Sequence, residues 1–273
     1  MKPINFTKLS GAGNDFIVID AQKGIDYKKL TLSVCDRTEG IGADGLLLLE
    51  KSKKADYKMR IINADGSEAE MCGNGARCMA AYIVETKKPK KKHFTMETLA
   101  GIIEAEAKGE VATVHLSDPQ DYRPNLEIDI DGRKIAVHYI DTGVPHTIVY
   151  VQGLKDMDVK TIGEKIRYHH AFKPRGTNAN FVEHLEEDLV DCRTYERGVE
   201  NETRACGTGS VAAALVSYLK THPQEDNKKK AKMRVRTKSG EILDVTFDII
   251  AGAVKNVYLK GSAKFIAKGE YYV

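Results

Sequence analysis

Apolar side chains concentrate in two short segments that predict buried helices. Residues 76–84 and 211–219 are apolar on nearly every side, which is typical of a helix enclosed by other structure. After each segment, residues 102–116 and 242–259 alternate between apolar and polar side chains and turn once, as hairpin strands do. The pattern therefore predicts an α+β protein with two similar halves, each a curved, mostly antiparallel sheet wrapped around one central buried helix.

The chain also contains a faint internal repeat, which supports two equivalent halves. Three pairs of segments resemble each other in the same order: 71–75 and 205–209, 98–104 and 237–243, 111–116 and 254–259. A fourth, weaker pair is 14–18 and 178–182. Glycine turns between strands look alike in many proteins, but this does not explain why a Cys-Gly-x-Gly precedes both hairpins. Two copies of one domain would be related by a pseudo-twofold axis, with equivalent residues facing each other.

The length of 273 residues fits two domains of ordinary size. We expect the crossover near residues 117–119, which contain a proline. The predicted first domain is 1–116, with 263–273 returning to it as a last strand. The predicted second domain is 117–262.

Composition and charge exclude some classes of function. The chain has 42 basic and 39 acidic residues, a net charge of +3, so nothing favours a nucleic-acid partner or a membrane surface. No stretch approaches the roughly 20 apolar residues of a membrane helix. The first residues lack the apolar segment of a signal peptide. We therefore expect a cytoplasmic protein.

The five cysteines are expected to be free thiols. An odd number in a reducing compartment argues against a disulfide framework, and no Cys/His spacing is that of a zinc site. Cys35, Cys78 and Cys192 are predicted to be core or structural residues, because none precedes a glycine turn.

Cys72 and Cys206 each come directly before a glycine turn that opens a predicted buried helix. The amides of a first helical turn have no partner within the helix, and the helix dipole adds positive charge there. Both effects stabilise a thiolate, and the same amides can bind a carboxylate. One such cysteine would also suit a protease, a redox enzyme or a buried core position. Two equivalent cysteines suit a racemase, which needs a proton-transfer group on each face of one carbon.

Six motifs spread over the chain resemble the diaminopimelate epimerase family. They are GAGNDF at 11–16, NADG at 63–66, MCGNGAR at 71–77, GVPH at 143–146, YERG at 195–198 and ACGTG at 205–209. The resemblance implies interconversion of LL- and meso-2,6-diaminoheptanedioate on the route to lysine and peptidoglycan. It also implies no pyridoxal phosphate, no metal and a homodimer.

The resemblance also implies roles for individual residues. It implies that the two catalytic acid/base groups are Cys72 and Cys206, that His146 and Glu196 tune the pKa of the thiols, and that the substrate is bound by Asn14, Asn63, Gly73, Asn74, Asn178, Glu196, Arg197, Gly207 and Thr208. Within the last set, the three asparagines other than Asn74 and the arginine would bind the non-reacting end. Taken singly, each asparagine could be a turn residue, the histidine a loop residue and the arginine half of a surface ion pair.

Two departures from the family pattern affect recognition of the non-reacting end. Val144 stands where the family often has asparagine, and Gly45 stands where some members have glutamine. Three alternatives stay open at this point: a racemase for proline, hydroxyproline or another amino acid, a non-catalytic amino-acid-binding protein, and a pyridoxal-phosphate enzyme. No lysine stands out as the Schiff-base residue that the last would need.

Overall fold

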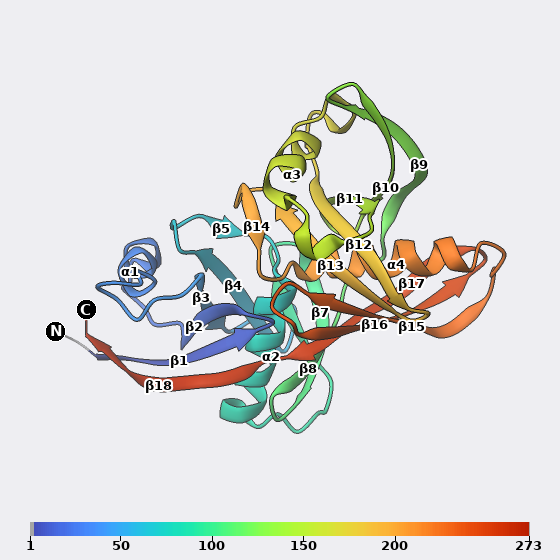
Figure 1. The fold of residues 1–273 in the computed structure, drawn as a ribbon. Coiled ribbons are helices and arrows are strands. Elements are labelled where there is room, and N and C mark those ends of the chain that lie inside the picture. The colour runs from blue at the N-terminus through green and yellow to red at the C-terminus, as the bar shows by residue number, and fades with distance from the viewer. Residues whose placement is uncertain (1–2, 273) are drawn as a thin grey trace. The chain divides into compact units, whose positions relative to one another are not determined.

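The computed structural model describes residues 3–272, and its chain divides into two compact units (Figure 1). One unit ends at His115 and takes up the chain again from Lys260. The other is continuous from Leu116 to Leu259. We call them unit 1 and unit 2. Each is described by itself below.

Unit 1 is a mixed sheet built around one long helix. Its elements are β1 (Pro3–Gly11), β2 (Asn14–Asp20), α1 (Tyr27–Val34), β3 (Gly45–Glu50), β4 (Tyr57–Asn63), β5 (Glu68–Ala69), α2 (Gly73–Lys87), β6 (Phe94–Thr98), β7 (Gly101–Lys108), β8 (Val111–His115) and β18 (Lys264–Tyr272). Neighbouring strands are antiparallel except for β2 with β3 and β4 with β6. A helix lies in the connection between the strands of each parallel pair, as a crossover requires.

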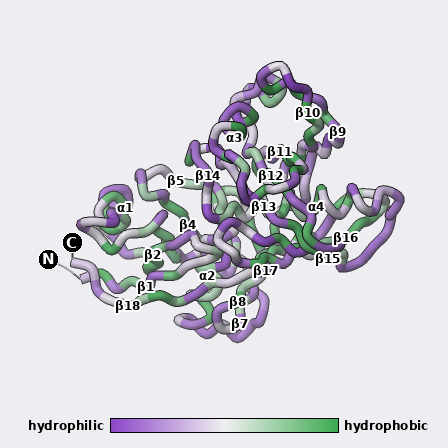
Figure 2. The backbone as a smooth tube through the Cα atoms, in the orientation of Figure 1, coloured by the Kyte–Doolittle hydropathy of each residue, from purple (hydrophilic) through white to green (hydrophobic). Residues whose placement is uncertain are grey.

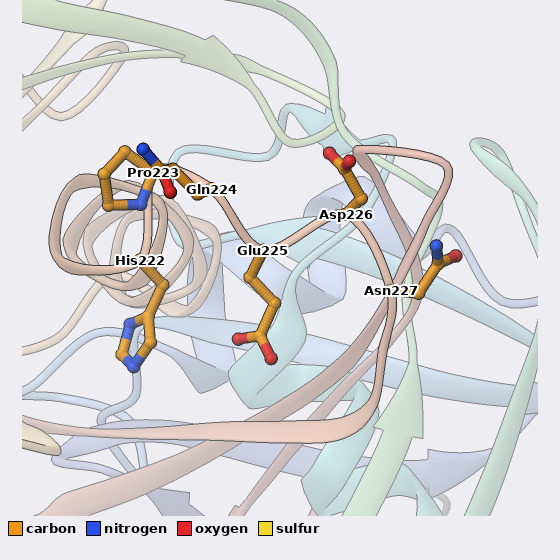
Figure 3. A pocket seen from close by; sticks show the side chains of 6 residues that line it. All are labelled: His222, Pro223, Gln224, Glu225, Asp226 and Asn227. Atoms are coloured by element: carbon orange, nitrogen blue, oxygen red, sulfur yellow. The ribbon is translucent and has the colours of Figure 1, made fainter.

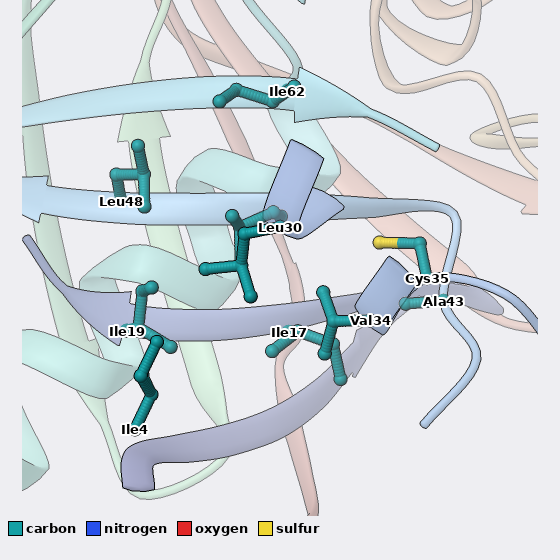
Figure 4. Close-up of a cluster of buried hydrophobic side chains, with 10 residues drawn as sticks. Ile4, Ile17, Ile19, Leu30, Val34, Cys35, Ala43, Leu48 and Ile62 are labelled. Carbon is teal, nitrogen blue, oxygen red and sulfur yellow. The ribbon is translucent and has the colours of Figure 1, made fainter. Parts of the chain in front are cut away.

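The helix α2 is the centre of unit 1. Its residues from Gly73 to Ile83 are all buried, and it packs against β1 to β4 and against β7 and β8. The shorter α1 covers part of the sheet through Leu30 and Val34, which join an apolar cluster with Ile17 and Leu48 (Figure 4). Cys35 lies in the same cluster.

Unit 2 repeats this plan. Its elements are β9 (Gln120–Ile130), β10 (Arg133–Asp141), β11 (Pro145–Tyr150), η1 (Leu154–Asp156), α3 (Val159–Arg167), η2 (His170–Phe172), β12 (Asn178–Glu186), β13 (Leu189–Glu196), β14 (Asn201–Thr203), α4 (Gly207–Thr221), β15 (Lys228–Thr237), β16 (Ile242–Ile250) and β17 (Ala253–Ser262). The last strand runs past the end of the unit. Strands β11 and β12 are parallel, as are β13 and β15, and α4 packs against β10 to β13, β15 and β16.

The predicted fold class is confirmed, including both central helices and the hairpins that follow them. Strand pairing makes β1 to β4 equivalent to β10 to β13, α2 equivalent to α4, and β6 to β8 equivalent to β15 to β17. The alternation of hydrophilic and hydrophobic residues along the strands can be followed in Figure 2.

One predicted repeat is wrong. Asn14 begins β2, whereas Asn178 begins β12, which is equivalent to β3 and not to β2. The two segments look alike because both are buried strands in a parallel pair that begin with asparagine. The true equivalent of Asn178 is Gly45. Phe16 of β2 pairs with Gly45, and His146, at the equivalent place in β11, pairs with Asn178.

Candidate active site

Cys72 is the N-cap of α2. Its backbone is extended (φ −144°, ψ 116°), and its Sγ accepts a hydrogen bond from the amide of Gly75 at 3.4 Å. A cap of this kind satisfies an amide that the helix leaves without an internal partner. The thiol also lies 3.9 Å from Oδ1 of Asn14, which can accept a hydrogen bond from it. The side chain is partly exposed, so it is open to a ligand.

Cys206 is the N-cap of α4, again with an extended backbone (φ −110°, ψ 114°). Its Sγ lies 3.6 Å from the hydroxyl of Thr208, and the residue is only 6% exposed. Burial raises the pKa of this thiol well above its ordinary value, and the Glu196 carboxylate raises the pKa further. The Thr208 hydroxyl and the Gly209 amide act in the opposite direction, too weakly to offset burial. Burial therefore favours the thiol form of Cys206 over the thiolate in the unliganded protein.

The Glu196 carboxylate is held beside its strand end by Thr203, whose hydroxyl donates to Oε2 at 2.9 Å. We predict that Glu196→Gln lowers the pKa of Cys206, because the change removes a negative charge that disfavours the thiolate. Alkylation of Cys206, followed against pH by peptide mass spectrometry, should begin at a lower pH. Glu187→Gln removes the same charge at an exposed turn and serves as the control. An unchanged profile in Glu196→Gln would contradict the prediction.

The glycine turns pack tightly against the strands beneath them. A Cβ at Gly75 would lie 3.2 Å from a methyl group of Leu47, whereas a Cβ at Gly209 would overlap Oδ1 of Asn180 and lie 3.2 Å from Sγ of Cys206. Close packing inside the protein, and not only the approach of a ligand, therefore explains these glycines.

The two glycines should respond differently to alanine. We expect Gly209→Ala to lower the free energy of unfolding by about 1–3 kcal/mol through overpacking, and to displace the Cys206 thiol. Gly75→Ala should be nearly neutral, because the Leu47 methyl can move and alanine favours the helix by about 1 kcal/mol. Thermal unfolding and turnover of both variants test this. Equal effects of the two changes would show that the Asn180 contact does not matter.

A buried arginine organises the start of α2. The guanidinium of Arg77 is fully buried and donates to the carbonyl oxygen of Gly73 at 3.3 Å, to Oδ1 of Asn74 at 2.9 Å and to the carbonyl oxygen of Ser262 at 3.4 Å. Asn74 in turn donates to Oδ1 of Asn14 at 3.4 Å. Sequence analysis did not single out Arg77, although it lies in the Cys72 motif. Its equivalent five residues after Cys206 is Val211.

The other polar residues predicted in unit 1 lie at strand ends. Asn14 opens β2 and donates to the carboxylate of Asp44 at 2.5 Å. Asn63 closes β4, is exposed, and donates to the hydroxyl of Ser67 at 3.0 Å in the following turn. The structure thus brings Asn14, Asn74 and Cys72 into one hydrogen-bonded group, while Asn63 makes its bond within its own turn.

In unit 2, Asn178 fixes the loop that carries Arg197. Its amide donates to the carbonyl oxygen of Pro145 at 2.9 Å and accepts from the backbone amide of Arg197 at 2.7 Å. The guanidinium of Arg197 is half-buried and donates to the carbonyl oxygen of Arg175 at 3.2 Å. In the unliganded protein Asn178 therefore positions Arg197 through the main chain.

His146 is fully buried on β11, with Nδ1 3.1 Å from Nδ2 of Asn180. Burial lowers its pKa to about 3, and the positive charge of Arg197 lowers it in the same direction. The imidazole is therefore neutral at ordinary pH, and any effect on a neighbouring thiol comes from a hydrogen bond and not from a positive charge.

The remaining cysteines are core residues, as expected. Cys35, Cys78 and Cys192 are all buried, and burial raises the pKa of Cys35 and of Cys192 to about 12. Within residues 3–272 no group of three or more His, Cys, Asp or Glu side chains could hold a metal ion. The same residues include no helix long and apolar enough to cross a membrane.

A surface hollow of about 570 Å³ lies in the loop after α4 (Figure 3). It is lined by His222, Pro223, Gln224, Glu225, Asp226 and Asn227. Cys206 is at the opposite end of the same helix, about 22 Å away at 1.5 Å per residue. The hollow contains none of the predicted site residues and is separate from the cysteine chemistry.

The fold is shared with two solved structures. A phenazine biosynthesis protein of the PhzF family from Bacillus anthracis has a TM-score of 0.74 at 19% identity, and each chain is covered completely. A probable proline racemase from Agrobacterium radiobacter has a TM-score of 0.74 at 14% identity, covering 99% of this chain and 93% of that one. At these identities the likeness establishes the fold class alone.

Sequence comparison identifies the family. The diaminopimelate epimerase family profile matches residues 6–120 and 138–266. A diaminopimelate epimerase from Aquifex aeolicus is 40% identical, with 97% of each chain covered, and one from Chlorobaculum tepidum is 42% identical over 96% of this chain and 98% of its own. The chain belongs to the diaminopimelate epimerase family and is an isomerase. The expected resemblance is confirmed.

Proposed function

We propose that the protein interconverts LL- and meso-2,6-diaminoheptanedioate by proton transfer between the substrate α-carbon and two cysteines. Its membership of the diaminopimelate epimerase family supports this substrate, and its similarity to diaminopimelate epimerases over nearly the whole chain supports this reaction. The observation that carries the mechanism is that Cys72 and Cys206 are N-caps of equivalent helices in two equivalent units.

In the proposed reaction, one thiolate removes the α-proton while the other thiol delivers its own proton to the opposite face of the carbon. The carbon inverts, and the two sulfurs exchange their protonation states. Reverse reaction exchanges the roles again. Since burial favours the thiol form of Cys206 in the unliganded protein, it acts as the proton donor in the direction that starts with a thiolate at Cys72.

The α-proton is weakly acidic, so the site must stabilise the developing carbanion. We propose that the first-turn amides at Gly73 and Asn74 and at Gly207 and Thr208 bind the reacting carboxylate, where helix dipoles favour negative charge. This needs neither an imine electron sink nor a metal. Arg197 offers a planar fork for the carboxylate of the non-reacting end. Asn14, Asn63, Asn178 and Glu196 are proposed to complete the binding of that end.

Solvent isotope incorporation tests this proposal. The purified protein, without added cofactor, should convert LL-diaminopimelate in D₂O to product that carries deuterium at the inverted α-carbon, as mass spectrometry and proton NMR would detect. Inversion without label would contradict proton delivery by a thiol whose proton exchanges with solvent.

A substrate panel separates the rival functions. Turnover should require a second ammonium and carboxylate, so proline and hydroxyproline should not react. Turnover of proline at a comparable kcat/KM would favour a proline racemase, and binding without α-proton exchange would favour a non-catalytic binding protein. We further propose a cytoplasmic homodimer, which light scattering of the purified protein and cell fractionation would test.

A further inference from the structure

The two units differ sharply beneath their glycine turns. In each unit, three equivalent residues on three neighbouring strands are almost completely buried, and the second and third of them are register partners. They are Phe16, Leu47 and Ile61 in unit 1, and His146, Asn180 and Thr194 in unit 2. In both units the middle residue touches the glycine three residues after the cysteine. The same place in the same fold is thus apolar in one unit and polar in the other.

The fold itself does not require the polar set. Unit 1 fills these positions with apolar side chains, each 3% exposed or less. Burying an imidazole, an amide and a hydroxyl costs free energy unless every polar group finds a partner. A polar set kept at a site where an apolar set suffices therefore points to a role in the chemistry at Cys206.

The amide of Asn180 has only one possible orientation. Its nitrogen faces the carbonyl oxygen of Thr147 at 3.1 Å, and the hydroxyl of Thr194 donates to its oxygen at 2.9 Å. Because a carbonyl oxygen cannot donate, the end that faces Thr147 must be the NH₂ group. Nδ1 of His146 lies 3.1 Å from this NH₂ group, closer than the carbonyl oxygen of Asn178 at 3.4 Å. Because an amide nitrogen does not accept hydrogen bonds, a proton on Nδ1 would find no acceptor there.

We infer that Asn180 is a positioning residue that holds His146 in the tautomer with its proton on Nε2. Nδ1 accepts from Asn180, and a neutral imidazole carries its one proton on the other nitrogen. Within the described residues, Nε2 is buried and has no hydrogen-bond partner. This leaves a buried N–H donor that is available to an anion.

The tautomer decides what His146 offers to the reaction. With the proton on Nε2, the ring donates to a thiolate or a carboxylate, whereas the other tautomer would present a lone pair and repel it. Oδ1 of Asn180 also lies against Gly209, and a Cβ added at Gly209 would be 3.2 Å from Sγ of Cys206. The polar residues beneath the turn are therefore next to the Cys206 thiol. This consequence for catalysis rests on the proposed function, but the tautomer itself does not.

Nitrogen NMR of protein labelled with ¹⁵N-histidine measures the tautomer directly. Of eight histidines, the His146 signals are those that disappear in His146→Phe, the residue that unit 1 has at this place. Between about pH 6 and 9, we expect one protonated nitrogen, Nε2, and one unprotonated nitrogen, Nδ1. A proton on Nδ1 in the wild-type protein would overturn the inference.

Asn180→Leu supplies the residue that unit 1 has beneath its turn, so the variant is expected to fold. It removes the donor to Nδ1, and the His146 signals should shift toward the average of two exchanging tautomers. We expect kcat to fall by about 10²-fold, at the lower end of the effect of a placed proton-transfer group. KM should change by less than about threefold, since binding is not the step affected.

Thr147→Val is the matched control. Thr147 follows His146 in β11 and is as deeply buried as Asn180, and its hydroxyl donates to the hydroxyl of Thr177 at 3.0 Å. The variant loses this hydroxyl but keeps the Thr147 carbonyl that binds Asn180. Its His146 signals and its kcat should match those of the wild type. Unchanged signals in folded Asn180→Leu would overturn the inference. If the tautomer is as stated but Cys206→Ala still epimerises, the proposed two-cysteine mechanism fails and the assignment of Asn180 stands.

Discussion

Cys72→Ala and Cys206→Ala should each abolish epimerisation. Each variant lacks one of the two groups that transfer protons, and inversion needs both faces of the carbon to be served. A positioned acid or base contributes about 10²- to 10⁴-fold, so the loss of kcat/KM should be at least that large. A coupled or circular-dichroism assay with LL-diaminopimelate measures it.

The control is Cys35→Ala, which removes a thiol from the α1 core cluster. This variant should retain turnover, with a modest loss of thermal stability from the smaller side chain. Turnover near the wild-type rate in either Cys72→Ala or Cys206→Ala would remove that residue from the mechanism. Loss of activity in Cys35→Ala as well would attribute the effect to the fold.

Arg77→Met should cause a large loss of stability. The change removes the charged donor of three hydrogen bonds, to the carbonyl oxygens of Gly73 and Ser262 and to Oδ1 of Asn74. A hydrogen bond to a charged group contributes about 1.5–3 kcal/mol, so we expect a loss of about 3 kcal/mol. The melting temperature should fall by roughly 2–4 °C for each kcal/mol in a chain of this size, as differential scanning calorimetry would show.

Val211→Met is the control for this prediction, because Val211 occupies the equivalent position of α4. Methionine is larger than valine, so the change should cost about 1–3 kcal/mol through overpacking, without the loss of any charged donor. Arg77→Lys separates charge from geometry, since lysine keeps the charge and lacks the fork that reaches three oxygens. Melting temperatures within a degree of wild type for Arg77→Met would show that the buried guanidinium is not important for stability.

The sequence predicted the central helices and the two cysteines, because apolar runs and Cys-Gly-x-Gly are local signals. It did not predict α1 or α3, which are short and only half-buried. Each nevertheless has an aspartate N-cap, Asp26 and Asp158, whose side chain accepts from a first-turn amide. These two aspartates were the sequence signal that could have predicted where the two helices begin. Their helices connect parallel strands, so missing them also hid the parallel pairs.

The residues beneath the glycine turns were missed for a different reason. Asn180 and Thr194 look like ordinary strand residues, and only comparison with Leu47 and Ile61 shows that they are unusual. The repeat that aligned Asn14 with Asn178 matched strands that are not equivalent, so it could not align His146 with Phe16. The hydrogen-bonded register of the strands supplied the correct alignment of the two units, which short sequence similarity did not.

The placement of β18 has a consequence for synthesis on the ribosome. This strand follows all of unit 2 in the chain, yet it pairs with β1 along nearly its whole length. Unit 2 is continuous, so all of its strands are available as soon as it emerges from the ribosome. One edge of β1 stays unpaired until β18 has left the exit tunnel. Exposed edges invite pairing with other chains. Nascent chains should therefore need chaperone protection at unit 1 and not at unit 2.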